Sequence, residues 1–425
     1  MISSSLPSPS FGISEAEMNE MSSVLQSYKA TDVLAQVEGM LEQMTSVTLN
    51  IAVTGESGAG KSSFINAFRG VDDEGPEAAE TGVTATTQVA LAYPHPMAHN
   101  VLLWDLPGIG TTSFQPGTYL EDVGLLKYDF FIIVTADRFQ EYHYALAKCI
   151  MQAQKKFYFI RNKVDRDLEA NAMRRSQKGL SDADVLDHLR ANCEKNLTMC
   201  QGGKPRVFLL SCFDPQRYDF PVLQMTLLEE LQGHKQHALL LSLPNLSATL
   251  IQNKKKALAG AVWKRAMVAC LSSVGVGNSL CSIIPKVMDT LKSYQQAFCL
   301  DADSLHRLAS ITGISFEVQN VNKSYSNALE STLSQAVPVQ QVLAKQLERR
   351  VPVLGTVIAG GVSFVACYFL LTSALKNLSE DGERVMQRIL LVAVSKQKYC
   401  LDDCECNQSC FGIQGSHLST MFTHV

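Results

Sequence analysis

Residues 46–63 constrain the fold of this chain more than any other stretch. Apolar side chains at positions 47, 49, 51 and 53 lie in a run rich in β-branched residues, which predicts a strand over residues 47–54. Residues 55–62 then read GESGAGKS, the G-x-x-x-x-G-K-S pattern of a phosphate-binding loop, or P-loop. A helix is predicted near residues 62–69, so the pattern lies between a strand and a helix, as the motif requires. This context argues against a glycine-rich turn that matches by chance.

The residue types of this loop suit the binding of a nucleotide's phosphates. Its glycines let the backbone turn tightly and approach phosphate oxygens, and the amides of residues 57–61 can form an anion-binding nest. The following helix adds the positive end of its dipole. We expect the Lys61 ammonium to contact the β- and γ-phosphates and the Ser62 hydroxyl to bind Mg²⁺. The predicted nucleotide contacts here are Gly55, Glu56, Ser57, Gly58, Ala59, Gly60, Lys61, Ser62 and Ser63.

A later motif predicts which base the nucleotide carries. Residues 162–165 read NKVD and follow an apolar strand predicted over residues 156–161. Guanine presents two adjacent donors, N1–H and the N2 amino group, which one carboxylate can accept and which adenine lacks. Asp165 is therefore the predicted specificity residue, the Lys163 stem can lie along the base, and Asn162 can brace the P-loop. Backbone contacts to the guanine oxygen are expected from Ser211 and Cys212, which follow a strand predicted over residues 206–210.

The sequence DLPG at residues 105–108 ends another predicted strand, residues 100–105. It is the D-x-P-G form of the D-x-x-G motif. We expect Asp105 to hold Mg²⁺ through a water and the Gly108 amide to contact the γ-phosphate. The cofactor and substrate predicted from these motifs are Mg²⁺ and GTP, with GDP as the product.

Residues 81–87 and the residue that follows Gly108 bear on the magnesium site and on the catalytic step. Residues 81–87 contain four threonines and occupy the position of the first switch loop, where Thr87 is the predicted metal ligand and Thr86 or Thr84 the alternative. Ras-type GTPases carry a glutamine directly after the glycine of D-x-x-G, where this chain has Ile109. We therefore expect slow hydrolysis unless a partner protomer completes the site. The candidate catalytic residues are Lys61, Glu56 and Gly108.

Strands and helices alternate up to about residue 233, which predicts an α/β domain with a mostly parallel sheet. Further strands are expected at residues 87–93 and 130–135, and after residue 234 only helical periodicity remains. We predict five segments. They are a flexible lead (1–13), N-terminal helices (14–45), a nucleotide-binding G domain (46–235), a C-terminal helical region (236–400) and a loose cysteine-containing tail (401–425).

The composition limits where in the cell the protein is expected and which classes of partner it can bind. A net charge of −4 and a pI near 6.2 argue against nucleic-acid binding. Twelve cysteines without a secretory signal predict reduced thiols and a cytoplasmic protein. The basic run at residues 254–256 predicts a solvated helix face, with contact to anionic lipid as the alternative. The cysteines between residues 400 and 410 are expected to be a reduced tail, with zinc binding or palmitoylation as alternatives.

Two uncharged stretches, residues 351–375 and 266–285, raise the question of a membrane span. The first is long enough to cross a bilayer, and the second contains several polar residues and glycines. The competing interpretation is a pair of core helices that bury their apolar faces against each other.

Several stretches resemble the immunity-related, interferon-inducible GTPases of vertebrate cells. They are GESGAGKSSFINAFRG, TGVTATT, NVLLWDLPGIGTTSF, KKFYFIRNKVDRDL, VFLLSCFDPQRYDFPVL, LLLSLPN, AFCLDADSLHRLA and VPVLGTVIAGGVSF. The resemblance covers roughly residues 14–400, and Lys61 matches the GKS-type members. It implies a Ras-like G domain and one helical domain built from both the N-terminal and C-terminal segments. It also implies that the two uncharged stretches lie inside that helical domain.

The resemblance further implies homodimers or homo-oligomers formed through the G domain, contacts with related GTPases, and peripheral association with membranes of pathogen-containing vacuoles. In GKS-type members a glutamate four residues after the threonine of T-G-V is implicated in hydrolysis across the dimer. Counted from Thr81, that position is Ala85 here, so hydrolysis could be slower or rest on Glu56 and the ribose hydroxyl. The alternative function is a weakly hydrolysing, guanine-nucleotide-dependent regulator of partner proteins. An ATP-driven motor or kinase is opposed by Asp165.

Overall fold

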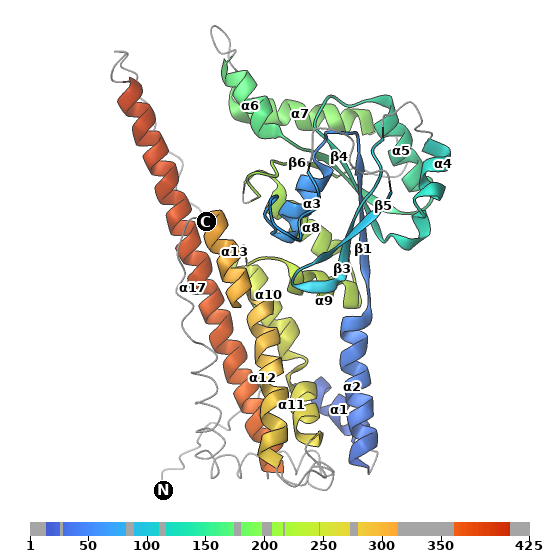
Figure 1. Cartoon of the computed structure of the whole chain (residues 1–425), viewed down its shortest axis with the longest axis vertical. Coiled ribbons are helices and arrows are strands. Elements are labelled where there is room, and N and C mark those ends of the chain that lie inside the picture. The colour runs from blue at the N-terminus through green and yellow to red at the C-terminus, as the bar shows by residue number, and fades with distance from the viewer. Residues whose placement is uncertain are drawn as a thin grey trace, which may run out of the picture.

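The computed structural model describes residues 14–25, 29–81, 89–109, 116–173, 180–197, 206–215, 217–245, 247–272, 279–312 and 361–408. An α/β domain and an elongated helical domain lie end to end (Figure 1). The predicted flexible lead, the first switch loop at residues 82–88 and the last residues of the tail lie outside the described residues.

A six-stranded sheet forms the centre of the G domain, in the order β2-β3-β1-β4-β5-β6. All neighbouring strands pair in parallel except β2 and β3, which form an antiparallel hairpin. The strands are β1 (Leu49–Gly55), β2 (Leu91–His95), β3 (Ala98–Asp105), β4 (Phe130–Thr135), β5 (Lys156–Arg161) and β6 (Val207–Leu209). The predicted mostly parallel sheet is confirmed. The second strand begins at Leu91, later than the predicted 87–93, and its hairpin turn with β3 lies at residues 96–97, between His95 and Ala98.

Helices cover both faces of this sheet. They are α3 (Lys61–Arg69), α4 (Pro116–Asp122), α5 (Glu141–Gln152), α6 (Val164–Met173), α7 (Asp182–Leu197) and α8 (Phe220–Glu230), with a 3-10 turn, η1 (Leu125–Lys127). Strand β4 shows why both faces are covered. Its side chains Phe130, Ile132 and Val134 pack with α3 and α8, whereas Phe131 and Ile133 pack with α4, α5 and α7. Side chains alternate along a strand, so a continuous apolar run predicts burial on both faces. Helix α6 begins at Val164, inside the NKVD motif, where no helix was predicted.

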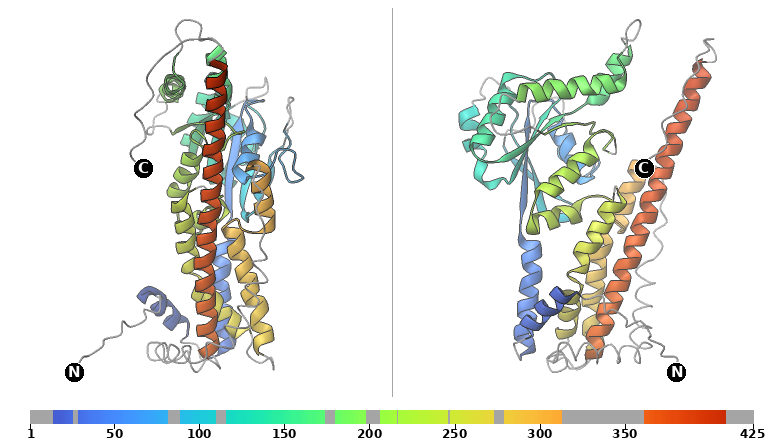
Figure 2. Two further views of the ribbon diagram at one scale, coloured as in Figure 1. Left: turned by 90° about the vertical axis from the view of Figure 1, so that its left-hand side faces the viewer. Right: turned by 180° about the vertical axis from the view of Figure 1, so that it is seen from behind.

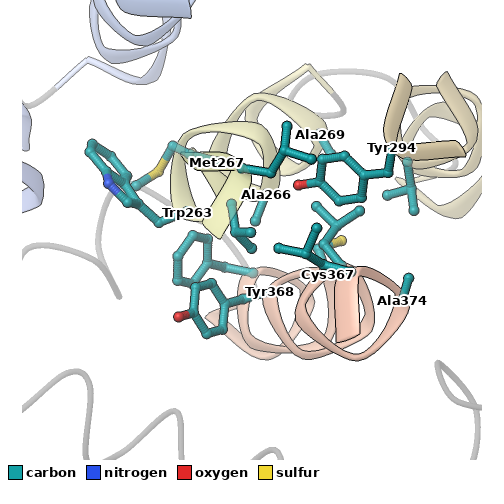
Figure 3. Packing of buried hydrophobic residues seen from close by; sticks show 14 of the residues in the cluster. Trp263, Ala266, Met267, Ala269, Tyr294, Cys367, Tyr368 and Ala374 are labelled. Atoms are coloured by element: carbon teal, nitrogen blue, oxygen red, sulfur yellow. The ribbon is translucent and has the colours of Figure 1, made fainter. Parts of the chain in front are cut away.

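The helical domain joins the two ends of the chain. Helices α1 (Glu15–Val24) and α2 (Ala30–Ser46) pack with α11 (Val262–Leu271), α12 (Ser279–Ala297) and α17 (Gly361–Gln408) in one hydrophobic core. Helix α9 (Gly233–Ser242) packs in the G-domain core, and α10 (Ala248–Ala259) and α13 (Ala302–Thr312) complete the described part of the helical domain. Figure 3 shows side chains of this core between α11, α12 and α17, where Tyr294 and Cys367 lie close together and Met267 lies beside Trp263. The structure thereby confirms the implied helical domain made from both ends of the sequence.

Helix α17 is the longest of the described elements, and it continues past the other described helices of its domain (Figure 2). It ends at Gln408, so the chain is still helical beyond residue 400, where the loose tail was predicted to begin. Within the described ranges, no helix combines the length and the apolar character needed to cross a bilayer. Residues 364–375 of the first uncharged stretch are largely buried against α11 and α12.

One side chain of the basic run is buried, contrary to the predicted solvated face. The Lys254 side chain on α10 is fully buried, whereas Lys256 is exposed. The Lys254 ammonium donates to the carbonyl of Leu243, to Asn245 Oδ1 at 3.1 Å and to the carbonyl of Ala297 at 2.6 Å. The periodicity of α10 could not reveal this, because the acceptors lie outside α10, at the ends of α9 and α12. Lys254 therefore connects the end of α9, which packs in the G-domain core, to the end of α12 in the helical domain.

Candidate nucleotide-binding site

The P-loop occupies the turn between β1 and α3 and depends on glycine at two close approaches. Gly55 has φ +148°, and a Cβ built there would lie 1.9 Å from the carbonyl oxygen of Val134 in β4. Gly60 caps α3 with φ +91°, and its Cβ would lie 2.5 Å from Asn162 Nδ2. Larger residues are excluded at both positions, because their side chains would displace the neighbouring strand or loop.

The lysine of the motif, Lys61, begins α3 and is buried in the loop. Its ammonium donates to the carbonyls of Gly55 at 3.3 Å and Glu56 at 3.2 Å. Burial lowers the pKa of Lys61, against the opposing influence of the Asp105 and Glu56 carboxylates. A Cβ built on Gly108 would lie 3.6 Å from this ammonium and 3.4 Å from the Ser57 amide nitrogen. The D-x-P-G turn therefore lies beside the P-loop lysine, where the phosphates are expected.

Two oxygen groups suitable for Mg²⁺ meet beside the P-loop. The Ser62 hydroxyl donates to Asp105 Oδ2 at 2.8 Å, although the two residues come from different motifs. Asp105 is buried at the end of β3, next to β1. A hydroxyl and a carboxylate are ligands that Mg²⁺ prefers, so these residues fit the metal. The third predicted ligand, Thr87, lies outside the described residues, as do its alternatives.

The guanine motif lies directly against the P-loop. Asn162 Nδ2 donates to the Ala59 carbonyl at 3.0 Å, which is the brace that the sequence predicted, and the Lys163 ammonium donates to the Gly58 carbonyl at 2.8 Å. On its other side, Asn162 Oδ1 accepts from the Cys212 thiol at 3.2 Å. Burial raises the pKa of Cys212 to about 12, so this thiol is protonated and able to donate.

The predicted specificity residue, Asp165, has an unused acceptor. Its Oδ1 is buried and has no hydrogen-bond partner among the described residues. A buried carboxylate oxygen without a donor is costly to leave unpaired. The two adjacent donors of guanine fit this requirement, and Ser211 lies buried in the following loop where a backbone contact to the base was predicted. The residues present therefore fit a guanine nucleotide.

The carboxylate of the candidate catalytic residue Glu56 contacts β4 and α5. Its Oε1 accepts from Thr135 Oγ1 at 2.8 Å and from the Ala136 amide at 2.9 Å, and its Oε2 lies 2.6 Å from His143 Nε2. Both oxygens are therefore engaged at the end of β4 and the start of α5. The predicted direct role of the Glu56 carboxylate in hydrolysis does not fit this geometry. His143 was not predicted as part of the site, because no motif links it to a residue so far away in sequence.

A mostly parallel sheet with a P-loop, a D-x-P-G turn and an NKVD loop at the same edge defines a P-loop protein that binds guanine nucleotides. The family model of the interferon-inducible GTPases (IIGP) matches residues 14–389. The chain belongs to this family, whose members hydrolyse GTP. The resemblance predicted from the motifs is thereby confirmed.

Relatives match over most of the chain. Interferon-inducible GTPase 5 of Rattus norvegicus is 38% identical over 89% of this chain and 83% of its own length. T-cell-specific guanine nucleotide triphosphate-binding protein 2 of Mus musculus is 35% identical over 87% of this chain and 89% of its own length. Among solved structures, a bacterial dynamin pair is described as oligomerised and as sensing and tethering membranes. Its match covers 92% of this chain and 78% of the dynamin chain, at 12% identity and a TM-score of 0.34.

Proposed function

We propose that this GTPase uses the edge formed by the P-loop and the NKVD loop to bind GTP and GDP, selecting guanine through Asp165. The observation that carries the proposal is the buried, unpartnered Asp165 Oδ1 in a loop that is hydrogen-bonded to the P-loop through Asn162 and Lys163. Because one loop contacts the other directly, a base held at Asp165 places its phosphates at the start of α3.

The roles of the remaining residues follow from their positions. The amides at the start of α3 and the Lys61 ammonium bind the phosphates, aided by the helix dipole. Ser62 and Asp105 would hold Mg²⁺, which supplies positive charge to the phosphates when bound. The backbone at Gly108 lies beside the Lys61 ammonium, so its amide would contact the γ-phosphate. Each of these groups stabilises charge, and none is a base that removes a proton from water.

Hydrolysis by the single chain is slow in this proposal. Ile109 replaces the water-orienting glutamine, Ala85 replaces the acid of the first switch loop, and Glu56 is engaged by Thr135 and His143. A second protomer would then supply the missing groups through a G-domain contact, which gives a GTP-dependent homodimer or homo-oligomer. Turnover per molecule should rise steeply with protein concentration, and a flat rate would contradict assembly.

The site of action in this proposal is the cytoplasmic face of intracellular membranes, including those of pathogen-containing vacuoles. Membership of an interferon-inducible family supports the role in defence within the cell. Association would be peripheral, and related GTPases would be further partners. Sedimentation with anionic lipid vesicles in GTP and in GDP tests this part, and recovery that does not depend on the nucleotide would contradict it.

The second candidate function is a weakly hydrolysing regulator that binds partner proteins in one nucleotide state. The engagement of both Glu56 oxygens is the observation that favours it, because it removes an acidic group from the catalytic step. Near-zero turnover at every protein concentration, together with tight GTP and GDP binding, would select this function over the assembling enzyme.

Calorimetry tests the nucleotide site itself. The full chain should bind GDP in the presence of Mg²⁺ at least 100-fold more tightly than ADP, about 2.7 kcal/mol. Equal affinity for the two nucleotides would contradict the guanine site, whatever the rate of hydrolysis.

A further inference from the structure

A buried histidine and a P-loop carboxylate form a contact that joins α5 to the P-loop. His143 on α5 is fully buried, and its Nε2 lies 2.6 Å from Glu56 Oε2. The other oxygen of Glu56 accepts from Thr135 and Ala136 at the end of β4. The side chain of Glu56 is therefore held from two elements that belong to none of the nucleotide motifs.

The direction of the histidine contact is set by a second hydrogen bond. The backbone amide of Gln140 donates to His143 Nδ1 at 3.1 Å, so Nδ1 carries no proton. Nε2 then carries the proton of the neutral ring and donates to the Glu56 carboxylate. The rings of Phe139 and Phe159 lie beside His143, with centroids 5.4 and 5.6 Å from it. These neighbours restrict rotation of the imidazole.

The main chain of Glu56 connects this contact to the phosphate-binding groups. Its carbonyl accepts from the Ala59 amide at 3.2 Å and from the Lys61 ammonium at 3.2 Å. The same residue forms an isolated bridge with Ile109, directly after the D-x-P-G turn. A displacement of Glu56 would therefore shift the loop, its lysine and the turn that faces the γ-phosphate.

We propose that His143 is a positioning residue for nucleotide binding: its Nε2–H fixes the Glu56 carboxylate and so holds the P-loop in its phosphate-binding form. This inference rests on the proposed nucleotide site. A P-loop that is already arranged does not have to be ordered when the phosphates bind, which favours affinity. Glu56 acts through its backbone and not as a base.

Two substitutions separate the two nitrogens of His143. In His143→Gln the amide nitrogen takes the place of Nε2 and keeps the donor to Glu56. In His143→Asn the amide oxygen takes the place of Nδ1 and keeps only the contact with Gln140. Calorimetry with GDP and Mg²⁺ should give an affinity for His143→Gln within about twofold of the wild type, and for His143→Asn roughly tenfold weaker, about 1.4 kcal/mol. Equal affinities for the two variants would overturn the proposal.

Glu56→Gln tests the same contact from the P-loop side and serves if His143→Asn does not fold. Its amide oxygen can still accept from Thr135 and Ala136, but its NH₂ group meets the Nε2–H donor of His143. We expect GDP affinity to fall by about tenfold, and an unchanged affinity would overturn the role of His143. Wild-type protein that does not bind GDP would instead refute the proposed nucleotide site, so the two failures are distinguishable.

Discussion

The side-chain amide of Asn162 donates a 3.0 Å hydrogen bond to the carbonyl of Ala59, so the loop after β5 directly supports the loop after β1. The same side chain accepts from the Cys212 thiol at 3.2 Å. Asn162 therefore lies at the junction of three loops that come from different parts of the sequence. Its contacts explain how a base-binding loop can also order the phosphate-binding loop.

Replacing Asn162 with alanine should weaken nucleotide binding. The change removes the donor to Ala59 and the acceptor for Cys212, and we expect GDP affinity to fall by about tenfold or more, roughly 1.4 kcal/mol. Titration calorimetry with GDP measures this effect. Asn253→Ala, at an exposed position of α10, is the matched control and should bind like the wild type. Unchanged affinity of Asn162→Ala would show that the brace is dispensable.

Replacing Asp165 with asparagine should change the preferred base. An asparagine amide can accept from N1–H and donate to the 2-oxo group of xanthine, whereas it repels the amino group of guanine. We expect GDP binding to fall by at least 100-fold, about 2.7 kcal/mol, and XDP to become the preferred diphosphate. Competition of both diphosphates against a fluorescent nucleotide measures this change. Asp187→Asn, an exposed change on α7, should keep the guanine preference.

Replacing Gly60 with alanine should damage the P-loop itself. The added Cβ would lie 2.5 Å from Asn162 Nδ2 at a residue with φ +91°, so both the backbone and the brace must shift. A loss of about 1–3 kcal/mol in stability is expected, together with weaker GDP binding. Gly39→Ala in α2 has nothing within 4 Å and should instead gain up to about 1 kcal/mol. Denaturant unfolding compares the two, and equal stability would contradict the strain at Gly60.

Acid should remove part of the stability through Glu56. Burial raises the pKa of this carboxyl, but the hydrogen bonds from His143, the Ala136 amide and Thr135 outweigh burial and lower it from 4.5 to about 2. Because the folded pKa is depressed, the contribution is complete above pH 4.5 and is lost as the pH falls towards 2. It is on the order of 3 kcal/mol.

The comparison of wild type with Glu56→Gln isolates this carboxyl. Urea unfolding at a series of pH values should show the wild type more stable near neutrality, with the difference shrinking below about pH 4.5. A difference that stays constant across the acid range would show that Glu56 does not titrate with a lowered pKa.

Replacing Lys254 with methionine should loosen the connection between the two domains. The ammonium satisfies the carbonyls of Leu243 and Ala297 and the side chain of Asn245, and methionine leaves these buried acceptors unpaired. We expect a loss of about 2 kcal/mol in the free energy of unfolding. Lys256→Met on the exposed face of α10 should cost less than about 0.5 kcal/mol. Equal effects would show that the buried contacts contribute little.

Much of the G domain could be predicted from local patterns. The apolar strands β1, β4 and β5 were found within a few residues, because strands buried on both faces are continuous apolar runs. The nucleotide motifs were found for a different reason, since phosphate and guanine each demand particular residue types at fixed spacing. The long helical stretch after residue 234 was divided less well, because one helical period continues across the turns that separate α9, α10 and α11.

The sequence by itself determined the class of fold and the identity of the groups that face phosphate, metal and base, because these depend on short patterns and on side-chain chemistry. Only the tertiary structure decided which groups support them. His143 approaches Glu56, and Lys254 reaches the end of α12, through contacts between elements far apart along the chain. Such contacts leave no local periodicity, since a side chain's partner depends on how whole helices and strands pack. The same packing engages both oxygens of Glu56, a candidate catalytic residue in the sequence, with neighbouring elements.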